Sequence, residues 1–292
     1  MGAAQVRTIE GGGGLGTMLR AALPVLPGVN QLPGVRKTSR DLPDLEVRRE
    51  GVAVERDQVA AYAAVCGFPT KDVAPLPYLH MLAFPLHMAL MTDTAFPFPA
   101  VGTVHLENAI TQHRPLRIGE QVDVTARAAN LRTHAKGRAF DIEVIAEVAG
   151  EPVWESTSVY LRLGGGDREN GDQGRSFDDV PSGGMTWRLP GDLGRRYAGV
   201  SGDHNPIHLY PLTARAFGFR RQIAHGMWTK ARALAAVENR LPDAVRVEVG
   251  FRKPIFLPGT VTFGAREAGE GLAFGVHGRS GSVHLLGRTT PA

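Results

Sequence analysis

The amino-acid sequence predicts an α+β protein made of two similar halves. The first reason is an internal repeat, in which YAAVCG at residues 62–67 matches YAGVSG at residues 197–202 in four of six positions, at an offset of 135 residues. A second match, between residues 114–122 and residues 253–261, follows downstream in the same order. The second reason is that helix-like segments come first in each half and strand-like segments follow, which is typical of the α+β class.

Each half is expected to start with a short strand and a short helix and to continue through a loop into a longer helix. The short helices follow Asp57 and Asp192 and are ended by Gly67 and Gly202. Alternating apolar and polar residues then predict antiparallel strands. These strands cover residues 122–131, 138–148 and 153–163 in the first half and residues 245–251, 261–266, 272–278 and 282–288 in the second.

Shifts in composition predict the boundaries of the two halves. Residues 164–184 are rich in Gly, Asp, Ser and charge and poor in apolar residues, which is typical of a flexible linker. The halves are therefore expected at residues 47–163 and 185–292. Residues 1–46 match neither half, and we expect them to form a short helix and an arm lying on the first half. Their glycine run at residues 11–14 lacks the Lys and Ser/Thr of a phosphate-binding loop.

The bulk composition indicates a folded protein without export or membrane insertion. The 292 residues are 43% hydrophobic and 21% charged. A single cysteine, Cys66, and the lack of a clear secretion signal favour a cytoplasmic location. The apolar run at residues 79–91 is shorter than the roughly 20 residues that span a bilayer. A net charge of +4 on scattered basic residues gives little support to nucleic-acid binding, and it favours an anionic substrate carrier.

The residues that indicate chemistry lie in the second half, where YAGVSGDHNPIH covers residues 197–208. Pro206 lacks a backbone N–H and disfavours helical backbone at Asn205, so Asp203 and His208 lie on a bent loop where their side chains can converge. A carboxylate and an imidazole beside one water molecule are suited to acid–base catalysis. The alternative is a local role, in which Asp203 only satisfies backbone N–H groups after the helix.

The first half lacks both of these polar groups. At the repeat offset, Phe68 and Val73 stand where the second half has Asp203 and His208. Only the second half can therefore perform acid–base chemistry. The contrast also disfavours the local role, because a carboxylate needed only for capping would be expected in both halves.

Residues 197–208 resemble the hydratase 2 motif of the MaoC-like (R)-specific enoyl-CoA hydratases. The segments FGF at residues 217–219 and IAHGMWTKAR at residues 223–232 are similar in pattern to mycobacterial-type 3-hydroxyacyl-thioester dehydratases. The resemblance implies a double hotdog fold, in which an antiparallel sheet wraps a long central helix in each half and the first half is inactive. It also implies a hydro-lyase of fatty-acid metabolism that reversibly hydrates trans-2-enoyl thioesters to (R)-3-hydroxyacyl thioesters.

The resemblance implies roles for individual residues. Asp203 and His208 would be the catalytic pair, the backbone N–H of Gly226 would bind the thioester carbonyl oxygen, and Asn205 would hold the loop. Hydration needs a proton taken from water as its oxygen attacks C3 and a proton delivered to C2. We assign the first transfer to Asp203 and the second to His208, although the two roles can be exchanged. A helix expected over residues 227–237 would stabilise the developing negative charge on the thioester oxygen through its N-terminus.

No metal or redox cofactor is implied, because coenzyme A or the phosphopantetheine of an acyl carrier protein is part of the substrate. His204 and His208 have a spacing that metal ligands can have, but Pro206 interrupts any helix there and no acidic third ligand follows. Four basic residues are either contacts for the phosphates of the carrier or exposed helix charge: Arg220, Arg221, Lys230 and Arg232.

Several positions have open alternatives. His225 is interpreted as a helix-start or packing residue rather than a catalyst. Tyr210 and Leu234 depart from the residues of relatives and put the polarity of the pocket in doubt. The apolar segment at residues 79–90 forms either the core of the first half or a tunnel for a long acyl tail. Two other functions stay open, a non-catalytic acyl-thioester-binding module and a hotdog thioesterase, and a homodimer is compatible with the sequence without residue-level support.

Overall fold

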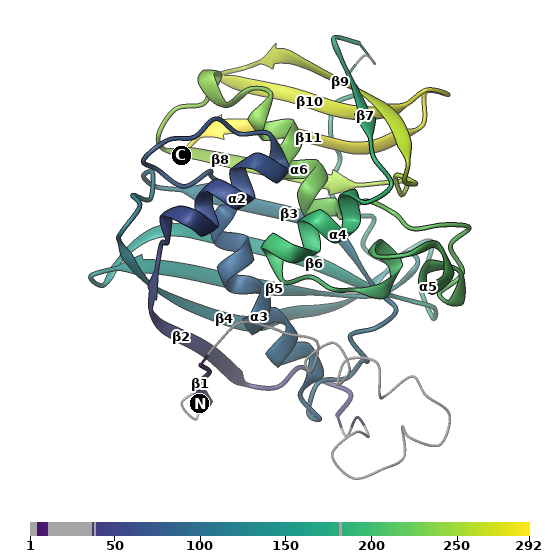
Figure 1. Ribbon diagram of the computed structural model, residues 1–292. Coiled ribbons are helices and arrows are strands. Elements are labelled where there is room, and N and C mark those ends of the chain that lie inside the picture. Colours follow the sequence, from purple (N-terminus) through teal and green to yellow (C-terminus); the bar gives the residue numbers. More distant parts are fainter. Residues whose placement is uncertain (1–4, 11–36, 38, 181–182) are drawn as a thin grey trace.

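The computed structural model describes residues 5–10, 37, 39–180 and 183–292, and it confirms the α+β prediction (Figure 1). The helices are α2 (Arg56–Cys66), α3 (Tyr78–Thr92), α4 (Leu193–Ser201), α5 (Pro211–Ala216) and α6 (Gly226–Ala235). The strands of the arm and the first half are β1 (Gln5–Thr8), β2 (Leu45–Ala53), β3 (Thr103–Gln112), β4 (Gln121–His134), β5 (Gly137–Val148) and β6 (Glu151–Leu163). The strands of the second half are β7 (Met185–Leu189), β8 (Val245–Phe251), β9 (Gly259–Ala268), β10 (Gly271–Gly278) and β11 (Val283–Pro291).

The described strands form one continuous sheet. Its order is β1-β2-β4-β5-β6-β3-β8-β11-β10-β9-β7. On either side of the β3–β8 pair the order is the same, with the strand after the central helix, then a three-stranded meander, then the strand before the first helix. β3 and β8 run antiparallel, with Ala109 opposite Glu248. The repeat in the sequence is therefore a repeat in topology, and the two halves are joined edge to edge.

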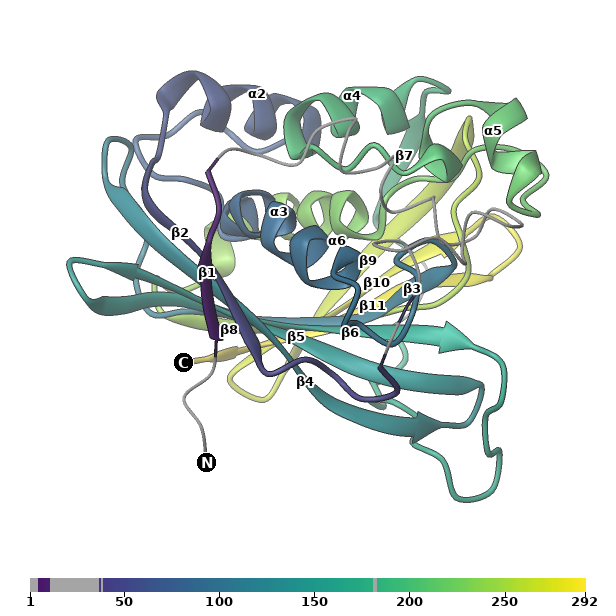
Figure 2. The same ribbon diagram turned by 90° about the horizontal axis from the view of Figure 1, so that it is seen from below.

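The helices form two layers over one face of this sheet. Figure 2 shows the central helices α3 and α6 next to the sheet and α2 and α4 outside them. The hydrophobic core lies between sheet and helices, where large side chains such as Leu86, Phe140, Leu234 and Phe274 are fully buried. Within the described ranges, no helix has the length and apolar character needed to cross a membrane.

Glycines end the first helix of each half, as the sequence predicts. Gly67 after α2 and Gly202 after α4 have φ angles of 80° and 74°, in the left-handed region that residues with side chains rarely adopt. The chain from α4 to α6 is longer than the chain from α2 to α3. This additional length forms the loop that carries Asp203 and His208, so the scaffold repeats while the loop does not.

Part of the N-terminal arm lies on the first half, as expected. β1 pairs in parallel with β2, and Arg7 forms an ion pair with Asp93 at 2.9 Å. Lys37 donates hydrogen bonds to the carbonyl oxygens of Met91 and Asp93 at the end of α3. The short helix that we expect in the arm falls outside the described residues.

The segment at residues 164–180 is fixed to the sheet, so the expectation of a flexible linker is wrong there. Asp172 forms an ion pair with Arg132 at 2.7 Å. The Arg175 N–H donates to Glu107 at 2.5 Å, and the Arg175 side chain pairs with Glu248. The polar composition that suggested flexibility instead supplies specific partners for charged groups on β3, β4 and β8.

The alternating pattern of the sequence does not reveal β3, although this strand lies near the centre of the sheet. Residues 107–110 of β3 are all buried, and two of them are the polar Glu107 and Asn108. The Asn108 side chain donates to Ser158 Oγ at 3.1 Å, and Glu107 accepts from the linker. A strand that buries polar residues with their own partners has no period-two hydrophobic signal.

Candidate active site

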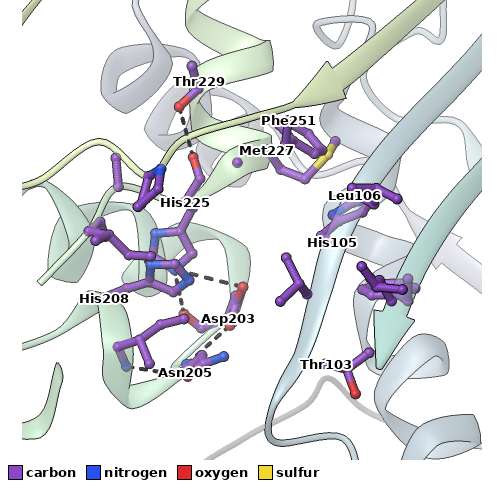
Figure 3. A pocket seen from close by; sticks show the side chains of 18 of the residues that line it. Thr103, His105, Leu106, Asp203, Asn205, His208, His225, Met227, Thr229 and Phe251 are labelled. Carbon is purple, nitrogen blue, oxygen red and sulfur yellow. Dashed lines mark hydrogen bonds and ion pairs between the residues drawn. The ribbon is translucent and has the colours of Figure 1, made fainter. Parts of the chain in front are cut away.

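The loop between α4 and α6 holds the candidate acid–base residues (Figure 3). A 3₁₀ turn at Pro206–His208 follows Asn205, whose side-chain oxygen accepts a hydrogen bond from the Ile207 N–H at 3.3 Å. The Asn205 N–H donates to Asp203 Oδ1 at 3.1 Å. Asn205 thus orients both the turn and the carboxylate, which is the position expected of a residue that holds the loop.

Asp203, His208 and His225 meet at one point, with side-chain N and O atoms within 4.8 Å of one another. His208 Nδ1 lies 2.9 Å from the Ile223 carbonyl oxygen, so Nδ1 carries the proton and Nε2 of the neutral ring has a free lone pair. His225 Nε2 lies 3.0 Å from the Asp203 carbonyl oxygen and 3.8 Å from its carboxylate. The two imidazole rings stack with centroids 3.7 Å apart. The structure therefore brings the predicted pair together and adds His225 to it.

Burial shifts the pKa values of these groups toward their neutral forms. Burial raises the pKa of Asp203, against the opposing effect of His208. Burial lowers the pKa of His208, against the opposing effects of the Asp203 carboxylate and the Ile223 carbonyl. The pKa of His225 is lowered well below its ordinary value, again chiefly by burial. Because the shifts of Asp203 and His208 have opposite signs, the two proton affinities approach each other, which suits proton exchange within the pair.

The same three side chains are the one group among the described residues with the spacing of metal ligands. Nδ1 of His208 and Nε2 of His225, however, each donate a hydrogen bond to a backbone carbonyl. Two stacked rings also cannot direct their remaining in-plane lone pairs toward one point. The arrangement therefore fits proton transfer better than the coordination of an ion.

Gly226 is the first residue of α6 and lines the cavity beside the pair. Its N–H has no hydrogen-bond partner among the described residues, as expected for the first turn of a helix. A Cβ at this position would lie 3.1 Å from the ring of Phe251, so a side chain would crowd the cavity wall. The free N–H and the positive end of the helix dipole can therefore approach a bound oxygen closely.

A cavity of about 480 Å³ adjoins these residues, a volume suited to a small organic ligand. Its walls come from both halves. Asp203 and His208 line it from the second half, and Figure 3 shows His105 of β3 on the opposite side of the cavity, from the first half. The first half thus contributes wall residues to the cavity that holds Asp203 and His208.

Helix α3 of the first half presents one face to the cavity and another to the core. Four residues at helical spacing line the cavity: Met81, Phe84, Met88 and Met91. Four leucines of the same helix are buried in the core: Leu79, Leu82, Leu86 and Leu90. One face of the helix therefore forms core and another lines the cavity, and the binding of an acyl tail along the cavity face stays a prediction.

The interpretation of Lys230 as a phosphate contact is wrong. Its side chain is fully buried, with Nζ 2.5 Å from Asn108 Oδ1 and 3.3 Å from the Val247 carbonyl oxygen. These partners lie on β3 and β8, so Lys230 ties α6 to the seam between the halves. Burial lowers its pKa well below the ordinary value.

The other three predicted basic residues lie elsewhere. The Arg232 guanidinium lies 5.0 Å from the ring of Trp187 and donates to a carbonyl at the end of α2, so the structure does not place it at the cavity. Arg220 and Arg221 lie over the ring of Phe256, at 4.2 and 5.9 Å. They adjoin cavity-lining residues in the sequence and remain candidate contacts for a carrier.

Three basic residues line the cavity without having been predicted: Lys136, Arg252 and Lys253. Lys253 is the first residue of the second repeated segment. The match between the two repeated segments is therefore the one feature of the sequence that could have indicated this residue. Tyr210 and Leu234 are not among the lining residues, because Tyr210 is half exposed and Leu234 is fully buried in the core. The doubt that these two positions raised about pocket polarity is therefore unfounded.

Comparisons with known proteins identify a family model and a relative that match this chain. The family model described as "MaoC like domain" matches residues 175–284. The chain is 41% identical over 255 residues to 3-hydroxyacyl-thioester dehydratase X of Mycobacterium tuberculosis, covering 85% of this chain and 86% of that protein.

Solved structures give the same result for the fold. The crystal structure of HtdX of Mycobacterium tuberculosis superposes with a TM-score of 0.76 at 37% identity, over 85% of this chain and 100% of that chain. A MaoC-like dehydratase from Phytophthora capsici shares the fold with a TM-score of 0.70 at 18% identity, over 87% of this chain and 96% of that chain. The expected double hotdog is confirmed.

Proposed function

The chain belongs to the MaoC-like dehydratase family, and on that premise we propose that it interconverts trans-2-enoyl thioesters and (R)-3-hydroxyacyl thioesters. The observation that carries the proposal is the convergence of the Asp203 carboxylate and the free Nε2 of His208 on one cavity wall, next to the unpaired N–H of Gly226. These are the acid, the base and the oxygen-binding donor that addition of water to a conjugated thioester requires.

The hydrogen bonding of His208 favours the reverse of our first assignment of the two proton transfers. Since Nδ1–H donates to Ile223, the neutral ring can only accept a proton, at Nε2. In the hydration direction His208 takes a proton from water as its oxygen bonds to C3, and Asp203, whose pKa is raised by burial, delivers its proton to C2. His208 then returns its proton to Asp203, and dehydration follows the same steps backwards.

The thioester carbonyl oxygen would accept a hydrogen bond from the Gly226 N–H. Negative charge grows on this oxygen as the nucleophile adds, so a fixed donor at a helix N-terminus stabilises the transition state more than the ground state. The acyl tail would lie along the cavity face of α3 that Met81, Phe84 and Met88 form. These acid–base steps require no metal or redox cofactor.

The carrier is coenzyme A or an acyl carrier protein, both of which are anionic at the attachment point. Arg252 and Lys253 line the cavity, and Arg220 and Arg221 are close by in the sequence to the lining residues Phe219 and Ile223. Positive charge at these places supports binding of phosphate groups. The single cysteine, which is buried and free, is in keeping with a cytoplasmic location.

The test is to mix the purified chain with a trans-2-enoyl-CoA and to follow the absorbance of the conjugated thioester. We expect the absorbance to fall without release of free thiol, and His208→Gln to remove this activity while the circular dichroism spectrum is retained. Release of free thiol would indicate a thioesterase instead. Binding of the thioester without any turnover by the unaltered chain would indicate a non-catalytic module.

A further inference from the structure

A cluster of polar side chains in the first half faces the cavity and takes no part in the mechanism above. His80 of α3, His105 of β3 and Tyr160 of β6 all line the cavity. His105 stacks on Tyr160 with centroids 4.6 Å apart and on His80 with centroids 6.0 Å apart. His87 lies behind them, with Nδ1 3.0 Å from the Tyr160 hydroxyl oxygen. We call His80, His105 and Tyr160 the polar wall.

The polar wall has hydrogen-bonding capacity that the protein does not use. Nδ1 of His80 and Nε2 of His105 are buried and have no partner among the described residues. The His80 side chain is only 5% exposed, and Tyr160 only 7%. These two atoms have almost no accessible surface of their own, although the rings that carry them line the cavity. A buried polar atom without a partner costs about 1–3 kcal/mol, so a small rotation of the rings toward a hydrogen-bonding ligand would be favourable.

The charge state of the polar wall limits what it can bind. Burial lowers the pKa of His105 to about 3, helped by the neighbouring His87 and Lys230. Burial also lowers the pKa of His80 well below its ordinary value, with the same two neighbours contributing. Neutral imidazoles and a phenol offer directed donors and acceptors without net charge. The partner is therefore a neutral oxygen group rather than a carboxylate or a phosphate.

The position of the polar wall indicates which part of a ligand it meets. Figure 3 shows His105 across the cavity from Asp203, and the apolar face of α3 with Met81 and Phe84 adjoins it. The Asp203 charge is near enough to contribute to the raised pKa of Tyr160. A substituent on the acyl chain shortly beyond the reacting C2–C3 bond would therefore lie at this wall.

We propose that His80, His105 and Tyr160 form a subsite for a neutral oxygen substituent, a hydroxyl or keto group, on the acyl chain of the substrate. This inference rests on the proposed function and goes beyond it, because it names the class of acyl group. The preferred substrate is an oxygenated enoyl thioester rather than a plain hydrocarbon one. Removal of the polar atoms should abolish the preference.

The experiment compares kcat/KM for pairs of 2-enoyl-CoA esters of equal length, one unsubstituted and one with a hydroxyl at successive positions beyond C4. We expect at least one hydroxylated ester to exceed its unsubstituted partner by about tenfold, the equivalent of one hydrogen bond. In His105→Phe, which keeps a ring to stack on Tyr160, and in Tyr160→Phe, this ratio should fall to about one.

His113→Phe is the matched control, because His113 is an exposed histidine paired with Glu155 away from the cavity. It should keep the ratio of the unaltered chain. A variant that is merely misfolded lowers both rates in proportion and leaves the ratio unchanged. Equal kcat/KM values for every pair of esters in the unaltered chain would overturn the subsite and would indicate that water is the partner of the polar wall. A preference for the hydroxylated ester that survives in both variants would also overturn it. Turnover of neither ester would instead overturn the proposed function.

Discussion

The two halves of the molecule share a strand order and differ in the chain between their first and central helices. In the first half this chain is short, and Phe68 follows its helix where Asp203 follows α4. Val73 bridges Arg117 as Ile223 bridges Phe256, so His208 lies in the additional length of the second half and has no counterpart in the first. In the second half it is longer and carries the candidate acid–base residues Asp203 and His208. The first half instead contributes the α3 face and the polar wall to the cavity. Under the proposed function the duplicated fold divides one site, with proton transfer assigned to the second copy and ligand contacts to the first.

The largest effect is expected when the candidate acid of the second half is removed. Asp203→Asn should lower kcat by about 10²- to 10⁴-fold, because an amide can neither give nor take the proton at C2. Steady-state hydration rates measure the effect. Asp57→Asn, which changes an exposed acid in the first turn of α2, is the control and should leave the rate unchanged. Equal losses in the two variants would contradict a division of chemistry between the halves.

The next effect concerns the Gly226 N–H. Gly226→Pro removes the donor at the first helical position, where proline is tolerated, and His225 before it already has extended backbone. Gly226→Ala adds a Cβ and keeps the N–H. We expect kcat of the proline variant to lie about 10²- to 10³-fold below that of the alanine variant. Similar rates in the two would mean that crowding against Phe251, and not the donor, is responsible.

The pH dependence of the rate tests whether the pair works with one shared proton. Hydration needs His208 neutral and Asp203 protonated. When the pH falls through the lower apparent pKa of the pair, His208 gains a proton and cannot accept one from water. When it rises through the upper apparent pKa, Asp203 loses the proton for C2. The profile of kcat/KM should be bell-shaped, with about a tenfold loss per pH unit on each side. A flat profile from acid to alkaline pH would exclude this scheme.

A smaller effect is expected where the first half contacts the acyl tail. Met81→Trp places a larger ring on the cavity face of α3 and should lower kcat/KM for long acyl chains by about tenfold more than for short ones. A series of enoyl-CoA chain lengths measures this. Met185→Trp, at an exposed methionine of β7, is the control and should give the chain-length profile of the unaltered protein.

The smallest effect on rate is expected at the seam between the halves. Lys230→Met leaves the buried Asn108 Oδ1 without its hydrogen-bond donor and should lower the free energy of unfolding by about 1–3 kcal/mol, measured with urea. KM for enoyl-CoA should not change, because Lys230 does not reach the cavity. A raised KM with an unchanged free energy of unfolding would instead indicate that Lys230 contacts a phosphate of the substrate.

Much of the scaffold is predictable from local patterns in the sequence. The glycine that ends α2 recurs at the end of α4, and the strands of each meander alternate in polarity, so both can be found without knowledge of the fold. The acid–base loop is also local, because Asp203, Asn205 and His208 lie within one short stretch. In these places short-range preferences and the tertiary structure agree.

The remainder depends on contacts between distant segments. From its place on a predicted helix, Lys230 is expected to be an exposed charge. Its burial depends on hydrogen-bond acceptors from β3 and β8, which belong to the two different halves. The composition of residues 164–180 suggests a flexible linker, but ion pairs and hydrogen bonds with residues of the sheet hold this segment in place. The polar wall joins His80, His105 and Tyr160 from three elements, and no sequence spacing connects them. Such features arise from long-range packing, which overrides local preference.

The antiparallel pairing of β3 with β8 has a consequence for the isolated halves. Each half, produced alone, would present this long strand as an open edge, with rows of unpaired N–H and C=O groups that invite association with other chains. In the intact chain β3 of the first half covers the strand edge that β8 of the second half would otherwise expose. For this reason a truncated second half should be insoluble or self-paired even though it retains every acid–base residue.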